Sequence, residues 1–67
     1  MRYYVNNNAQ STGEHEVHSE NCFWLSLVTD KRYLGNFSSC AEALRAARVF
    51  YSNVDGCIHC CRECHRR

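Results

Sequence analysis

The sequence predicts an α+β domain: a small three-stranded antiparallel sheet, one main helix and a short helical tail at the C-terminus. Three observations indicate this fold class. Short apolar segments of strand length alternate with polar turns in the first half of the chain, and a single strong helix signal follows them. The chain has 67 residues and no composition break, so we expect one domain over residues 1–67.

The three predicted strands cover residues 2–5, 15–18 and 33–37. Between the first two lies a polar loop, 6–13, rich in asparagine and ending in glycine, residue types that favour turns over regular pairing. This loop predicts that the first two strands run antiparallel. Residues 23–28 form a strongly apolar segment, which we expect to fill the core beside His18 and Cys22.

The helix is predicted over residues 39–52. Ser39 and Glu42 have the spacing of a capping box, in which the two side chains satisfy backbone donors at the start of a helix. Behind them, apolar residues recur at helical spacing and form one face: Cys40, Ala43, Leu44, Ala47, Phe50 and Tyr51. Residues 53–56 end the helix, and the tail, 58–66, is long enough for one or two helical turns.

The cysteines form the strongest chemical signal. His18-x3-Cys22 and Cys57-x2-Cys60 are two close pairs of nitrogen and sulfur donors, the arrangement that a tetrahedral zinc ion requires. We therefore predict a zinc-stabilised domain with these four residues as ligands. His15 competes with His18 for the nitrogen position; the two are an odd number of residues apart on one strand, so only one of them can face the ion.

The environment expected for these thiols is reducing. Residue 1 leads directly into the first predicted strand, with no apolar leader and no run long enough to span a membrane. We therefore expect a cytoplasmic protein with no membrane partner, because clustered cysteines in that compartment bind metal more often than they form disulfides. A domain of this size is marginally stable unless it is cross-linked, so the ion would contribute directly to folding.

The remaining thiols allow three interpretations. Cys40, Cys61 and Cys64 could join His65 or His59 in a second metal site. They could form a Cys40–Cys61 or Cys40–Cys64 disulfide on oxidation. They could also be buried thiols packed between the tail and the main helix, which is the interpretation we favour.

The order of these motifs resembles the N-terminal zinc-binding domain of the Ada DNA-repair methyltransferase. The resemblance covers roughly residues 14–60 and is carried by His18-x3-Cys22, a helix from Ser39 to Ala47, and Gly56-Cys57-x2-Cys60. It implies metal-holding roles for Cys22, Cys57 and Cys60. His18 stands where that family has the cysteine that accepts a methyl group, so the resemblance does not imply methyl transfer here.

The whole chain also resembles short bacterial proteins that share a tyrosine-valine-asparagine start, a His-Glu-Val-His segment, Tyr-Leu-Gly and a terminal Asp-Gly-Cys cluster. Those segments lie here at residues 4–6, 15–18, 33–35 and 55–57. This second resemblance implies no activity.

The expected function is non-enzymatic, because one histidine and three cysteines fill all four positions of a tetrahedral zinc ion and leave none for a substrate. We expect a recognition module that binds a protein partner. One alternative is nucleic-acid binding, and another is metal handling or thiol redox sensing. The nucleic-acid alternative would use the basic residues of the helix and tail: Arg45, Arg48, Arg62, Arg66 and Arg67.

Charge argues against strong binding of nucleic acid. The formal net charge is +1 with neutral histidines, and it falls to zero when zinc binds and three thiols lose their protons. Proteins that hold a phosphate backbone by electrostatics carry a clear basic excess.

Overall fold

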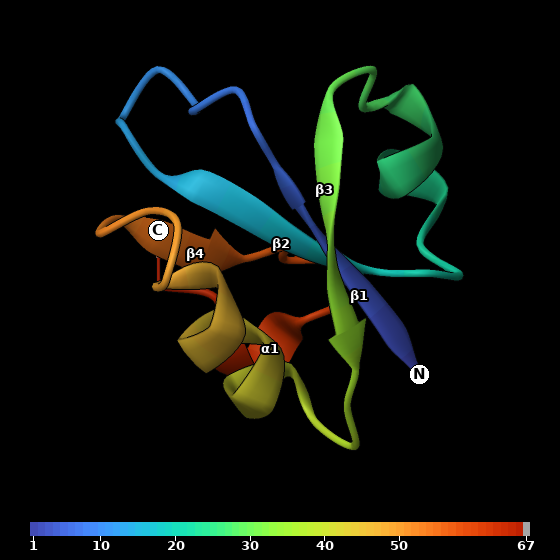
Figure 1. Ribbon diagram of the computed structural model, residues 1–67. Helices are drawn as coiled ribbons and strands as arrows, with labels where there is room; N and C mark the ends of the chain where they lie inside the picture. The colour runs from blue at the N-terminus through green and yellow to red at the C-terminus, as the bar shows by residue number, and fades with distance from the viewer. Residues whose placement is uncertain (67) are drawn as a thin grey trace.

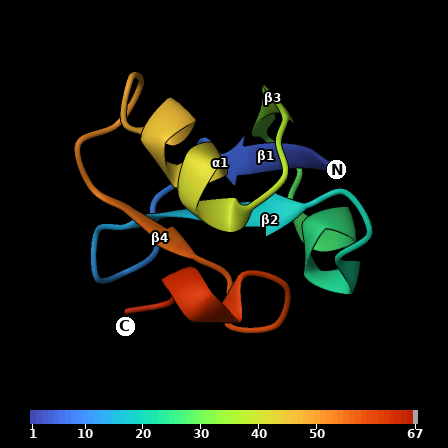
Figure 2. The same cartoon turned by 90° about the horizontal axis from the view of Figure 1, so that it is seen from below.

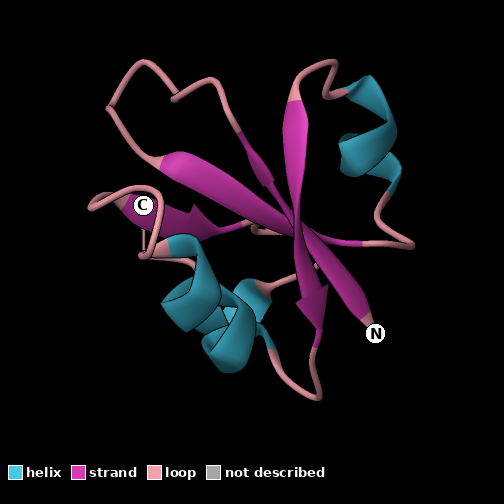
Figure 3. Ribbon diagram, in the orientation of Figure 1, coloured by secondary structure: helices cyan, strands magenta, loops and turns pink. Residues whose placement is uncertain are grey.

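Residues 1–66 are described in the computed structural model, which places one α-helix against a four-stranded sheet (Figure 1). The α+β class with one main helix is therefore confirmed. The sheet has the strand order β3-β1-β2-β4, and two 3-10 helices complete the chain (Figure 3). The elements are β1 Arg2–Asn6, β2 His15–Ser19, η1 Phe23–Leu27, β3 Lys31–Asn36, α1 Cys40–Ala47, β4 Val54–Gly56 and η2 Arg62–Cys64.

The expectation of three antiparallel strands is wrong in its count. β1 pairs antiparallel with both β2 and β3, as expected for the first three strands, but β4 adds a fourth strand parallel to β2. The sequence Val-Asp-Gly of β4 has poor strand propensity and resembles a turn. Tertiary pairing determines its conformation: His15 N–H donates to Asn53 O at 2.9 Å, and Cys57 N–H donates to Val17 O at 3.0 Å.

Residues 23–28 fill the core beside the first ligand pair only in part. Residues 23–27 form η1, in which Leu25 is buried against Cys22 and Cys57, whereas Phe23 is 68% and Leu27 58% exposed. This mostly apolar segment has no regular alternation of apolar and polar residues that would determine which side chains face inward. Most of this run therefore lies on the surface.

Helix α1 ends at Ala47 and is shorter than the predicted 39–52. Ser39 is the N-cap and its hydroxyl accepts from Glu42 N–H at 3.4 Å, so the predicted start is confirmed. Past Ala47 the backbone tightens into i→i+3 hydrogen bonds, and Phe50, predicted on the buried face, is 48% exposed beneath the Arg32 guanidinium. The predicted helical tail contains a single 3-10 turn, η2.

Two apolar clusters lie on the two faces of the sheet, because successive side chains of a strand point to opposite sides. Tyr3, Val5 and Val17 face α1 and form the main core with its buried residues. Tyr4 of β1 packs instead with Leu25, Cys22 and Cys57 in a smaller cluster. Helices α1 and η1 lie well apart in two perpendicular views (Figures 1 and 2).

None of the helices formed by residues 1–66 has the length and apolar character that crossing a bilayer requires.

Candidate metal centre

Four segments of the chain meet at one buried cluster. His18 lies on β2, Cys22 directly precedes η1, Cys57 directly follows β4, and Cys60 lies in the next turn. The imidazole nitrogen and the three sulfurs all lie within 4.8 Å of one another. His18 and Cys57 are each 2% exposed. The structure thus brings together the four residues predicted from the two sequence pairs.

The separations between donor atoms fit a tetrahedral ion. Nδ1 of His18 lies 3.8 Å from Sγ of Cys22 and 3.9 Å from Sγ of Cys60, and the sulfurs of Cys22 and Cys57 are 4.0 Å apart. A tetrahedral site with zinc–sulfur bonds of about 2.3 Å has sulfur–sulfur edges of about 3.8 Å. These three separations are close to the edges of such a site, so the cluster could hold a metal ion.

His15 and His18 point to opposite faces of β2, because side chains alternate along a strand, and only His18 faces the cluster. His18 and Glu16 share the face of the metal cluster, and His15 shares the opposite face with Val17. The His15 ring stacks on Tyr51, with centroids 3.7 Å apart, and its Nδ1 lies 3.0 Å from Asn6 O. His15 therefore belongs to the packing near α1 and is not part of the cluster.

Neighbouring groups suit a metal-bound form of the cluster. Ser19 N–H donates to the sulfur of Cys60 and His59 N–H to that of Cys57, both at 3.4 Å. Such backbone donors stabilise thiolates. On the other side of the imidazole, Nε2 of His18 lies 3.5 Å from Oε1 of Glu16. A carboxylate behind a ligating histidine fixes its tautomer and raises its basicity.

Burial sets the protonation of these groups. It raises the pKa of Cys57 and Cys60, so their thiolates need a positive charge placed among them. It lowers the pKa of His18, which favours the neutral imidazole that binds metals. The chemistry of the donors thus fits a divalent cation.

Cys40, Cys61 and Cys64 lie together in the core, but they do not form with His65 a group of donors close enough to share an ion. Within residues 1–66, the group of His18 and the three cysteines described above is the one set of three or more His, Cys, Asp or Glu donors close enough to share an ion. Cys40, Cys61 and Cys64 are buried in the core beside α1, where burial raises the pKa of Cys61 to about 11. His65 is directed elsewhere, with Nδ1 2.9 Å from Gly56 O. The three residues are buried thiols, and no disulfide joins them in the structure.

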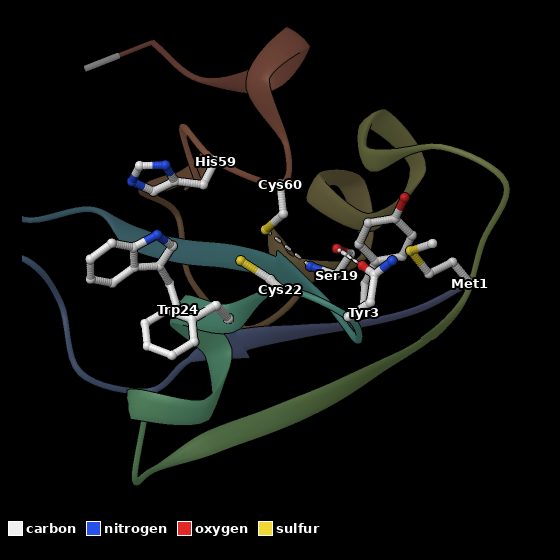
Figure 4. A pocket seen from close by; sticks show the side chains of 9 residues that line it. Met1, Tyr3, Ser19, Cys22, Trp24, His59 and Cys60 are labelled. Atoms are coloured by element: carbon white, nitrogen blue, oxygen red, sulfur yellow. Dashed lines mark hydrogen bonds between the residues drawn. The ribbon is translucent and has the colours of Figure 1, made fainter.

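Sequence reasoning missed two features of the site. One is Glu16 behind His18, which the alternation along β2 could have indicated. The other is a groove of about 480 Å³ beside the cluster, lined by Cys22, Cys60 and the exposed rings of Trp24 and His59 (Figure 4). The Trp24 and His59 rings stack with centroids 4.9 Å apart. His59, considered above as a ligand of a second metal, forms this stack instead.

Of the arginines predicted as nucleic-acid contacts, only some lie close together in the structure. Arg45, Arg48 and Arg66 line one groove beside α1, whereas exposed Arg62 is not among its lining residues. Arg67 lies outside the described residues.

Comparison of the chain with known protein families, with curated proteins and with solved structures finds no match. The resemblance to the Ada domain therefore stays a prediction.

The carboxylate behind His18 gives a first testable prediction. We expect Glu16→Gln, which keeps the shape of the side chain but removes its charge, to weaken metal affinity by about 10- to 100-fold. The measurement is competition for zinc with a chromophoric chelator. Glu63→Gln, the same change at an exposed position on η2, is the matched control and should leave affinity unchanged. Equal affinity in both variants would contradict this role for Glu16.

Proposed function

We propose that this protein is a non-enzymatic zinc module whose metal ion holds a protein-binding surface in shape. The donor set supports zinc as the ion, because three thiolates and one imidazole in a tetrahedron are typical of structural zinc sites. When bound, the ion would act as a cross-link. Its four protein ligands would leave no position for water or a substrate, which argues against catalysis.

The observation that carries the proposal is an exposed aromatic surface on the two ligand-bearing segments. We define this aromatic surface as Phe23, Trp24 and His59. Phe23 and Trp24 follow Cys22 directly, and their rings meet edge to face with centroids 5.5 Å apart. His59 lies between Cys57 and Cys60 and stacks on Trp24. An ion bound by these cysteines would fix both halves of the surface relative to each other.

A protein partner suits the chemistry of this surface. Phe23 is 68% and Trp24 43% exposed, and the same segments also expose Leu27 and Ile58. Exposed apolar groups that gather in one place mark interaction sites, and tryptophan is enriched among residues that dominate binding energy. The cytoplasm remains the proposed location, because the ligand thiols must stay reduced to bind zinc.

The test is capture of a partner by the zinc-loaded protein from a lysate of its own host, followed by titration of the purified partner. We expect Trp24→Ala to weaken that binding by at least about 30-fold, the loss of 2 kcal/mol that defines a hot spot. The factor lost in Trp24→Ala should change little as the salt concentration is raised, because the contact made by Trp24 is apolar. Val49→Ala truncates a side chain that is 79% exposed after α1 and serves as the control.

Two results would contradict the proposal. One is a partner whose affinity is the same for Trp24→Ala and Val49→Ala. The other is binding that survives complete removal of the metal, because the surface would then not depend on the ion. Replacement of zinc by cobalt, which accepts the same tetrahedral ligands, should preserve binding.

A further inference from the structure

A second groove, of about 270 Å³, lies between α1, β4 and the C-terminal segment. Three arginines line it: Arg45 on α1, Arg48 at its C-terminal cap, and Arg66 after η2. Apolar atoms line the rest, mainly Leu44, Val54 and the Cys64 side chain. The groove therefore combines positive charge with an apolar surface. It uses elements different from those that carry the aromatic surface.

The three guanidinium groups form no ion pair with any carboxylate of residues 1–66. The acidic residues on the neighbouring elements accept hydrogen bonds from other groups or are exposed, and the charge of Arg45 acts on Glu42 without a close ion pair. Glu42 accepts from the backbone and hydroxyl of Ser38, each at 2.9 Å, and Asp55 is 1% exposed and accepts from Arg66 N–H at 2.7 Å. Glu63 is exposed on η2. Three arginines that line one groove without a close ion pair form a local excess of positive charge in a chain whose net charge is only +1.

We propose that this groove binds an acidic segment of a protein, with carboxylates on the arginines and an apolar side chain against Leu44 and Val54. Arginine suits this role because its planar fork donates two parallel hydrogen bonds to one carboxylate. The inference rests on the proposed function in one respect, that the partner is a protein. It adds the chemistry of a second contact on that partner.

The shape and charge of the groove favour a peptide over a nucleic acid. A phosphate backbone is recognised along an extended basic surface, and its binding needs a net basic excess. Here the three arginines border one short groove, and the zinc-loaded chain would be neutral overall. The apolar lining also suits an amino-acid side chain packed between carboxylates.

The experiment measures binding of a short fluorescent peptide, with glutamates flanking a central leucine, to the zinc-loaded full chain. We expect its glutamine counterpart to bind at least about tenfold more weakly, because hydrogen bonds to charged groups each contribute about 1.5–3 kcal/mol. The double variant Arg45→Gln/Arg48→Gln should lose at least the same factor. Arg2→Gln/Arg62→Gln removes the same charge at exposed positions outside the groove and should bind normally.

Amide chemical shifts in the same titration report where the peptide binds, and we expect changes around Leu44 and Val54 but not at Trp24. Equal loss in the two double variants, or no binding of the acidic peptide, would overturn the inference. So would tighter binding of single-stranded or duplex DNA or RNA that Arg45→Gln/Arg48→Gln abolishes. A partner that is captured through Trp24 while the peptide fails to bind would remove this inference and leave the proposed function standing.

Discussion

Replacing Cys57 with serine is expected to abolish zinc binding and to unfold the domain under conditions in which the unmodified protein is folded. Cys57 follows β4 directly and is 2% exposed. It connects the turn that carries the last two ligands to the sheet. A serine hydroxyl is neutral at pH 7 and binds zinc poorly. Structural zinc contributes on the order of 10 kcal/mol in small peptides, as much as the entire stability of many domains. Metal analysis and near-ultraviolet circular dichroism measure the two losses.

Cys40→Ser is the matched control for that prediction. Cys40 is as buried as Cys57, at 3%, but lies in the core beside α1 and outside the donor cluster. A hydroxyl at this apolar position should lower the free energy of unfolding by about 1–3 kcal/mol and leave zinc binding intact. Equal and total loss of metal in both variants would instead indicate a second metal site that contains Cys40.

Gly56→Ala is expected to have the second largest effect. A Cβ atom on Gly56 would lie 2.7 Å from Cys61 O, 2.9 Å from Cys64 Cβ and 3.0 Å from Cys61 Cβ. Overlap with a backbone oxygen cannot be relieved by rotating a side chain, so the turn that carries Cys57 and Cys60 must move. We expect a loss of about 3 kcal/mol or more in the free energy of unfolding, together with weaker zinc binding.

Gly13→Ala separates this overlap from backbone strain. Gly13 has φ of +101°, where alanine is strained, but its added Cβ would meet only Asn53 Nδ2 at 3.4 Å. The expected loss is about 1–2 kcal/mol, with zinc affinity unchanged. Urea unfolding of the zinc-loaded proteins measures both variants. A loss at Gly56 no larger than that at Gly13 would contradict close packing of the metal-binding turn.

The parts of the fold that sequence could predict have a local cause. The first three strands follow from short apolar segments separated by turn residues, and the start of α1 follows from the hydrogen-bonding chemistry of Ser39 and Glu42. No local sequence signal predicts β4. Its three residues become a strand only because β2 offers an unpaired edge, a fact of tertiary structure. The surface position of Phe23 and Leu27 has the same origin, since hydrophobicity alone does not determine which apolar run the core can accommodate.

The candidate site was more predictable than the fold around it. Ligand spacing identified two donor pairs, and the two-residue period of a strand predicted that His15 and His18 face opposite sides, whereas the structure shows that His18 is the one in the cluster. The spacing of residues in the sequence could not predict which side chains from distant segments contact each other. The stacking of Trp24 on His59 joins residues that follow different ligands, and the arginine groove joins Arg66 to α1 across the chain. Both depend on contacts between segments that are distant in the sequence.

The most direct test of the central claim is X-ray absorption at the zinc edge on protein purified without chelator, combined with metal analysis. The account predicts one zinc per chain, bound by three sulfurs at about 2.3 Å and one nitrogen at about 2.0–2.1 Å. A metal-free protein that remains fully folded with its six thiols paired would contradict it, and so would a zinc ion bound mainly by oxygen.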